Sequence, residues 1–153
     1  MPLLEAGAPV PDLTLTDQDE QPVNLTDYAG RKLVVFFYAQ DGSGTCTKEA
    51  CSLRDGYADL QARGYEVVGV SPDSEKSHRN FIAKQQLPYR LISDPENKLV
   101  QAFGAWGEKK MYGKTYDGIL RSTFLIDESG RVSHVIDKVV SKDHANQILE
   151  LLA

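Results

Sequence analysis

Cys46 and Cys51, two cysteines five residues apart, are the side chains whose type and spacing could do chemistry in this chain. They lie in the stretch GTCTKEACSLRD, after the apolar run KLVVFFY and a small polar loop at residues 40–45. The apolar run predicts a buried strand, and the spacing after the loop predicts a helix. A thiol at such a junction meets unpaired backbone N–H groups and the positive end of the helix dipole, which favour the thiolate. Cys46 is therefore a candidate nucleophile.

Position alone leaves a second interpretation of Cys46 open. An ordinary thiol with a pKa of about 8.5 is only a few per cent ionised at neutral pH, whereas a helix start and a nearby cation can bring the pKa to about 3.5 to 7.5. Most single cysteines are instead inert, partly buried thiols.

The spacing of the two cysteines restricts how they can bond. Five residues of α-helix give about 7.5 Å of rise and about 140° of rotation. A disulfide normally joins Cα atoms less than about 7 Å apart. A disulfide between Cys46 and Cys51 therefore requires the first helical turns to unwind. Two unrelated cysteines remain the alternative.

Length, composition and charge predict one domain over residues 1–153. The chain has a hydrophobic fraction of 41%, a net charge of -5 and no sustained basic run, so nucleic acid or an anionic membrane has little electrostatic support as a partner. No signal-like N-terminus is present, and no segment approaches the roughly 20 apolar residues of a membrane span. We expect a cytoplasmic monomer with no nucleic-acid or membrane partner.

The other polar residues indicate neither a metal nor a cofactor. The cytosol keeps thiols reduced, so a transient catalytic disulfide fits better than a structural one. There is no CxxC pair, and His78, His134 and His144 are far in sequence from the cysteines. No glycine-rich phosphate loop is present. We expect no metal, no cofactor and no chemical role for the histidines, which are more typically surface or hydrogen-bonded residues.

Hydrophobic periodicity and turn residues predict a mixed α/β fold whose last strand pair is antiparallel. The apolar run at residues 32–38 is expected to form the centre of the sheet. The expected strands cover residues 12–16, 32–38, 65–71, 87–92, 122–127 and 132–136. The expected helices cover residues 46–63, 74–86, 98–103 and 142–152, and residues 104–118 are expected to form a loop or irregular hairpin.

The residues around the cysteines match a known family. GTCTKEACSLRD after VVFFYA closely resembles the atypical two-cysteine peroxiredoxins of the bacterioferritin-comigratory-protein, or peroxiredoxin Q, group. VVGVSPDSEKSHRNF, LISDPENKL and FGAWGEKKMYGKTYDGILRSTFLID resemble that group in order and spacing, so the resemblance covers nearly the whole chain. It implies the peroxiredoxin variant of the thioredoxin-like fold, with a central mixed β-sheet flanked by helices. It also implies that Cys46 is the peroxidatic cysteine and Cys51 the resolving one.

The same resemblance extends to two positions before Cys46. Ser43 holds the place of the family's Thr or Ser, and its hydroxyl can donate to and accept from a bound peroxide. Ala39 stands where the family has Pro, and it lacks the fixed φ and the ring of that residue. We expect the loop DGSGT to be more mobile than in the group, with activity retained.

Arg121 and Glu49 complete the candidate site. Arg121 in GILRSTFLID matches the family's motif arginine, which implies that its charged fork stabilises the thiolate and polarises the peroxide. Without that match, a surface arginine is the commoner interpretation. Glu49 could orient the arginine by a bidentate pair, or could be a first-turn acid that complements the helix dipole.

The predicted activity is thiol-dependent reduction of hydrogen peroxide and organic hydroperoxides. The thiolate becomes a sulfenic acid, the second cysteine condenses with it, and the family resemblance implies thioredoxin or a similar dithiol as reductant. A thioredoxin-like disulfide reductase or isomerase is one alternative, although it favours a CxxC pair. A redox-sensing domain is another, and it differs from a peroxidase in consuming only about one equivalent of peroxide.

An aromatic group in residues 104–118 has two interpretations. Trp106, Tyr112 and Tyr116 lie beside Lys109 and neighbouring lysines. Such residues are favoured in docking surfaces, and they are equally typical of loop packing beneath a solvated basic rim.

Overall fold

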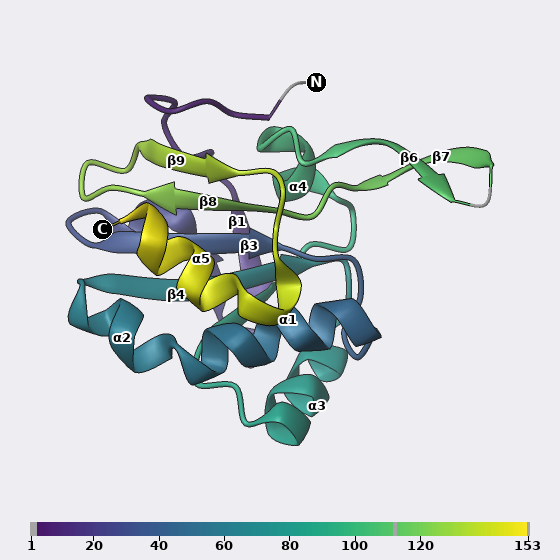
Figure 1. Cartoon of the computed structure of the whole chain (residues 1–153), viewed down its shortest axis with the longest axis horizontal. Coiled ribbons are helices and arrows are strands. Elements are labelled where there is room, and N and C mark those ends of the chain that lie inside the picture. The colour runs from purple at the N-terminus through teal and green to yellow at the C-terminus, as the bar shows by residue number, and fades with distance from the viewer. Residues whose placement is uncertain (1–2, 112, 153) are drawn as a thin grey trace.

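A seven-stranded mixed sheet forms the centre of the computed structural model, which describes residues 3–111 and 113–152 (Figure 1). The strand order is β2-β1-β5-β4-β3-β8-β9. The strands are β1 (Thr14–Asp17), β2 (Pro22–Asn24), β3 (Lys32–Phe37), β4 (Tyr65–Ser71), β5 (Arg90–Ser93), β8 (Ser122–Ile126) and β9 (Val132–Ile136). Strands β3, β4 and β5 are parallel to one another, whereas β8 pairs antiparallel with β3 and with β9. The mixed sheet and the antiparallel last pair are as predicted.

Helices cover both faces of this sheet. The helices are α1 (Gly44–Asp55), α2 (Tyr57–Ala62), α3 (Glu75–Gln85), α4 (Lys98–Ala102) and α5 (His144–Leu151), with 3-10 turns η1 (Leu25–Tyr28) and η2 (Ser141–Asp143). One core cluster joins the sheet to α1, α2, α3 and α5, and a second joins its other face to η1 and α4. Among the described residues, no helix is long and apolar enough to cross a membrane.

Strand β3 contributes to both core clusters. Leu33, Val35 and Phe37 belong to one cluster, while Val34 and Phe36 belong to the other. This alternation is the period-two geometry of a strand, and a strand buried on both faces reads as one continuous apolar run. The middle strand is β4, so the expected centre of the sheet is wrong by one strand.

In place of the single helix expected over residues 46–63, the structure has two helices, and the first begins at residue 44. Ser43 is the N-cap of α1, and its side chain accepts a hydrogen bond from the backbone N–H of Cys46. Serine is a favoured N-cap, so the helix starts at Gly44 and Cys46 is its third residue rather than its first. Gly56 separates α1 from α2, and a Cβ atom there would clash with Ala145 of α5. The break therefore lets α5 pack closely against the end of α1.

Residues 106–111 and 114–119 form a paired hairpin, so of the two predicted alternatives, a loop or an irregular hairpin, the hairpin is the closer one. β6 (Trp106–Met111) pairs antiparallel with β7 (Lys114–Ile119), and the hairpin projects from the body of the molecule (Figure 1). Trp106 is half-buried against the core, whereas Tyr116 is exposed. Loop packing therefore describes Trp106 but not Tyr116, and Tyr112 lies outside the described residues.

Candidate active site

Cys46 lies where the chain passes from β3 into α1. The residue is 1% exposed and belongs to the first turn of the helix. Burial alone would raise the pKa of its thiol, but hydrogen bonds from the Ser43 hydroxyl, Arg121 and the backbone N–H of Gln40 outweigh it and hold the pKa below the ordinary value. Each of these donors favours the thiolate. The expected electropositive environment of Cys46 is therefore present.

Arg121 reaches this thiol from the junction of β7 and β8. Its Nη2 atom lies 3.0 Å from Sγ of Cys46, and its Nη1 atom lies 2.6 Å from Oε1 of Glu49. Burial disfavours the guanidinium charge. The hydrogen bond to Cys46 and the charge of Glu49 outweigh it and raise the pKa of Arg121 above its ordinary value. One guanidinium fork thus holds both a thiol and a carboxylate.

Glu49 lies one turn along α1 from Cys46, with its side chain fully buried. The geometry fits the orienting interpretation rather than that of a first-turn acid that complements the helix dipole, because Glu49 lies beyond the first turn of α1. The contact is not the expected bidentate pair, because only Oε1 reaches Arg121. Burial raises the pKa of Glu49 to about 7, although the charge and hydrogen bond of Arg121 act in the opposite direction.

Cys51 occupies the same helix but a different environment. It is half-buried, and its thiol donates to Oε1 of Gln85 at the end of α3, with 3.4 Å between the two atoms. Both cysteines are free thiols in a continuous α1. The helical rise between them, about 7.5 Å, keeps them from bonding while α1 is intact.

Comparison with known proteins agrees with this geometry. The AhpC/TSA family model matches residues 6–135. The chain belongs to this family. It is 44% identical to a putative peroxiredoxin Bcp of Haemophilus influenzae over 97% of this chain and 96% of that protein, and 41% identical to peroxiredoxin Bcp of Escherichia coli with the same coverage.

Solved structures of the same group share the fold. The bacterioferritin comigratory protein of Xanthomonas campestris matches with a TM-score of 0.88 and 37% identity over 97% of each chain, and its structures address alkyl peroxide reduction. A mutant of peroxiredoxin Q from Xylella fastidiosa matches with a TM-score of 0.90 and 31% identity, covering 97% of this chain and 95% of that one. The present protein is thus a peroxiredoxin of the Bcp group, with the expected thioredoxin-like fold and peroxidase activity.

The loop that precedes α1 and the Cys46 thiol is fastened to the start of α3. Asp41 receives hydrogen bonds on its carboxylate from Tyr38 (2.5 Å) and Ser77 (2.8 Å), and its backbone N–H donates to Asp73 (2.7 Å). His78 Nδ1 lies 2.7 Å from the same Asp41 carboxylate. These bonds tie down a loop that lacks the family's proline.

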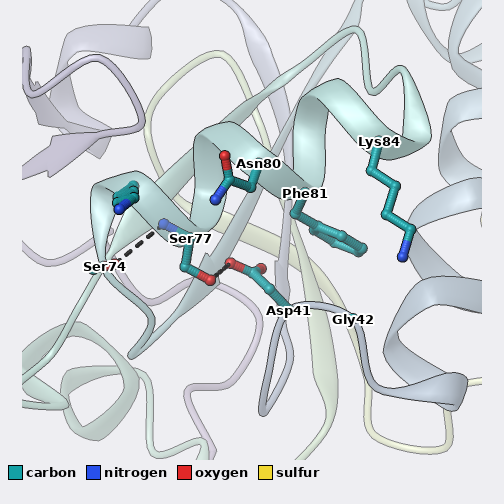
Figure 2. Close-up of a pocket in the computed structure, with 8 residues that line it drawn as sticks. Asp41, Gly42, Ser74, Ser77, Asn80, Phe81 and Lys84 are labelled. Atoms are coloured by element: carbon teal, nitrogen blue, oxygen red, sulfur yellow. Dashed lines mark hydrogen bonds between the residues drawn. The ribbon is translucent and has the colours of Figure 1, made fainter.

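Two neighbouring features of this loop do not extend the active site. In the described part of the chain, Asp41, Asp73 and His78 form the one group with metal-ligand spacing, but hydrogen bonds already occupy all three side chains. A pocket of about 400 Å³ lies between residues 41–42 and α3, which contributes Phe81 and Lys84 to its lining (Figure 2). It includes neither the thiol nor the arginine of the candidate site.

His144 is the residue beside the site that the sequence did not indicate. It is fully buried on α5, with Nε2 2.7 Å from Oγ1 of Thr123 and 3.6 Å from Oε2 of Glu49. His144 and Glu49 are 95 positions apart, and no local pattern links them. Only the packing of α5 across α1 brings them together.

Proposed function

We propose that Cys46 is the peroxidatic cysteine of this peroxiredoxin. The observation that carries the proposal is the 3.0 Å hydrogen bond from Arg121 to the Cys46 sulfur in a buried, hydrogen-bonded environment. The thiolate attacks one peroxide oxygen, so that an S–O bond forms and the O–O bond breaks. The sulfur is oxidised to a sulfenic acid, and the departing oxygen takes a proton to become water or an alcohol.

Three groups support this displacement. Arg121 can hold the thiolate and the peroxide oxygens at once, because its fork presents several N–H donors. Ser43 can donate to one oxygen while its own oxygen still caps the helix. Backbone N–H groups at the start of α1 stabilise the negative charge that develops on the leaving oxygen.

Cys51 completes the cycle in this proposal. Its thiol attacks the sulfenic sulfur, which forms a disulfide and releases water. Because α1 holds the two cysteines apart, its first turns must unwind before this step. A dithiol reductant, proposed to be thioredoxin, then reduces the disulfide and is itself oxidised. The proposed substrates are hydrogen peroxide and organic hydroperoxides, and the proposed working form is a monomer.

Turnover tests the assignment. Purified protein with thioredoxin, thioredoxin reductase and NADPH should consume many equivalents of peroxide, and the Cys46→Ser variant should consume none above background. Consumption of about one equivalent by the wild type would identify a redox sensor instead. Near wild-type turnover in the Cys46→Ser variant would refute Cys46 as the nucleophile.

A further inference from the structure

A group of fully buried polar side chains lies next to Arg121. Glu49, Thr123 and His144 are each fully buried there. Oε1 of Glu49 accepts from Arg121, but among the described residues Oε2 has no hydrogen-bond partner. Nε2 of His144 lies 3.6 Å from this oxygen. An unpartnered carboxylate oxygen in such a place is costly unless a proton satisfies it.

The hydrogens of His144 follow from its neighbour Gln147. Nε2 of Gln147 lies 2.8 Å from the carbonyl of Lys138, and Oε1 lies 2.9 Å from the backbone N–H of Val140. A carbonyl can only accept and an N–H can only donate, so the amide orientation of Gln147 is determined. Its Oε1 is also 2.8 Å from Nδ1 of His144. Nδ1 must therefore carry a hydrogen.

A neutral His144 then presents a bare nitrogen towards Glu49. With its hydrogen on Nδ1, the ring accepts through Nε2, and the Thr123 hydroxyl at 2.7 Å can donate to it. If Glu49 were ionised, a carboxylate oxygen would face that nitrogen with no proton between them. A proton on Oε2 of Glu49 removes the conflict, because a neutral acid sets no negative charge against the bare nitrogen. Its O–H can point towards Nε2 across 3.6 Å, a polar contact longer than the hydrogen bond that Thr123 makes to the same atom. A second proton on His144 would instead place a cation near Arg121.

We propose that Glu49 holds a proton in the reduced enzyme and directs it towards Nε2 of His144, which makes His144 a positioning residue for the Glu49–Arg121–Cys46 chain. This inference rests on the proposed roles of Cys46 and Arg121. His144 does not touch the peroxide. It acts through Glu49, whose charge determines how strongly the Arg121 cation stabilises the thiolate.

The ionisation preferences of the two partners agree with this placement. Burial raises the pKa of Glu49 to about 7, against the influence of Arg121. Burial lowers the pKa of His144 to about 4, and the charge of Arg121 acts in the same direction, although the hydrogen bond to Gln147 opposes it. Below about pH 7 the proton of this pair therefore lies on the carboxyl group of Glu49 and not on His144.

The remaining ionisable groups around Glu49 do not replace this pair. Arg121 stays charged. Cys46 lies on the same helix as Glu49 and accepts the other hydrogen bond of the Arg121 guanidinium. Tyr89, next to β5, faces α1 and donates its hydroxyl to the carbonyl of Ala50 at 2.8 Å. Burial, followed by the charge of Glu49, raises the pKa of Tyr89 well above its ordinary value, so the phenol stays neutral.

Protonation of Glu49 has a direct effect on the nucleophile. An ionised Glu49 competes with the Cys46 thiolate for one guanidinium, and like charges close together raise the pKa of the thiol. A protonated Glu49 leaves the Arg121 charge to the sulfur. The dependence of thiolate reactivity on pH should therefore contain a second ionisation near pH 7 in addition to that of Cys46.

Infrared difference spectroscopy on the reduced full-length protein tests the proton directly. Between roughly pH 5 and 9 we expect the carbonyl stretch of a protonated carboxyl group to disappear with a midpoint near pH 7, and to be missing in the Glu49→Gln variant. Absence of a Glu49-dependent band at every pH would overturn the proposal. This outcome is independent of how any His144 variant folds.

His144→Gln tests the positioning role. An amide can donate to Oε2 and so favours the ionised carboxylate; we expect the midpoint of the Glu49 band to fall by about one pH unit, or tenfold in proton affinity. The apparent pKa of Cys46, measured by alkylation rate against pH, should rise in this variant. His134→Gln is the matched control, because the His134 side chain hydrogen-bonds to its neighbour Ser133 on β9, away from the Glu49–Arg121–Cys46 chain. An unchanged Glu49 midpoint in a folded His144→Gln protein would overturn the role.

The two proposals fail in different ways. If peroxide consumption requires Cys46 but no Glu49 band is found, only the proton inference is wrong. If Cys46 is dispensable, the proposed function is wrong, while the Glu49 band can still be measured.

Discussion

Cys46 and Cys51 belong to one helix, yet their surroundings differ more than their spacing suggests. Cys46 is 1% exposed and accepts hydrogen bonds from a cation, a hydroxyl and a backbone N–H. Cys51 is half-buried and its thiol donates a hydrogen bond to an amide oxygen, that of Gln85. The helix start alone does not create this contrast. Arg121, 75 positions away at the junction of β7 and β8, supplies the charge that distinguishes the two thiols.

The largest expected effect comes from exchanging each cysteine for serine. Cys46→Ser should abolish the rapid reaction with peroxide, because serine provides no comparable nucleophile. Cys51→Ser should still consume one equivalent at the wild-type rate and then stop, since its role begins after the sulfenic acid forms. Stopped-flow peroxide consumption in single turnover measures both. Fast oxidation that depends on Cys51 and not on Cys46 would reverse the roles of the two cysteines.

Removing the charge of Arg121 should bring Cys46 closer to Cys51 in reactivity. Arg121→Met should lower the second-order rate constant with peroxide by one to three powers of ten, about 1.4 to 4 kcal/mol of transition-state stabilisation, and should raise the thiol pKa. Arg121→Lys should restore only part, because lysine lacks the fork. Arg131→Met, at an exposed arginine bonded to the carbonyl of Gly7, is the control. An unchanged rate in folded Arg121→Met would make Arg121 a structural residue only.

The oxidised state should remove the contrast, because a disulfide requires the helix that carries both cysteines to unwind. A Cys46–Cys51 disulfide requires α1 to unwind, which frees the Ala50 carbonyl from Tyr89. Amide exchange over residues 42–55 should be faster by about tenfold or more in the disulfide form, with β3 and β4 much less affected. Hydrogen exchange with mass spectrometry measures both forms. Equal protection of α1 in a confirmed disulfide form would contradict the unwinding.

The smallest effect should come from the helix cap beside Cys46. Ser43→Ala removes both the cap and a donor to the thiolate, so it should cost about 1 kcal/mol of unfolding free energy and slow peroxide reduction several-fold. Ser74→Ala is a matched control, because Ser74 caps α3 in the same way through the backbone N–H of Ser77 at 3.1 Å. It should cost similar stability without the loss of rate. Urea unfolding and the peroxide rate constant separate the two contributions. Equal rates in both variants would limit Ser43 to capping.

The sequence was sufficient for features that depend on local patterns. The strand at residues 65–71 matches the prediction at both ends, and the apolar run after residue 31 is the doubly buried strand it indicated. The family motif indicated Arg121, whose guanidinium lies 3.0 Å from the Cys46 sulfur. Local chemistry and a matched motif are enough in such cases.

Features that depend on distant packing were not predicted. The break at Gly56 reflects the approach of Ala145 from α5, whereas the sequence pattern predicts one continuous helix through this position. The loop without the family's proline is expected to be more mobile than in the group, and this stays a prediction. The residues that bond to Asp41 lie just after β3, just after β4 and in α3, and no local pattern indicates them. His144 reaches Glu49 for the same reason. None of these contacts leaves a periodic trace in the sequence.

The buried pair of Glu49 and His144 also affects how folding is coupled to protons. At about pH 5.5 an unfolded chain carries its proton on the imidazole, whose ordinary pKa is 6.5, and not on the carboxyl group, whose ordinary pKa is 4.5. Folding reverses this, because the pKa of Glu49 rises to about 7 and that of His144 falls to about 4.

Folding therefore moves one proton between the two side chains without net uptake or release. The raised pKa of Glu49 alone would make stability fall as the pH rises from 4.5 to about 7. The lowered pKa of His144 alone would make stability rise with pH from about 4 to 6.5. The two slopes cancel, so the enzyme can keep a group that titrates near neutral pH beside its nucleophile while the stability of the fold stays insensitive to that titration.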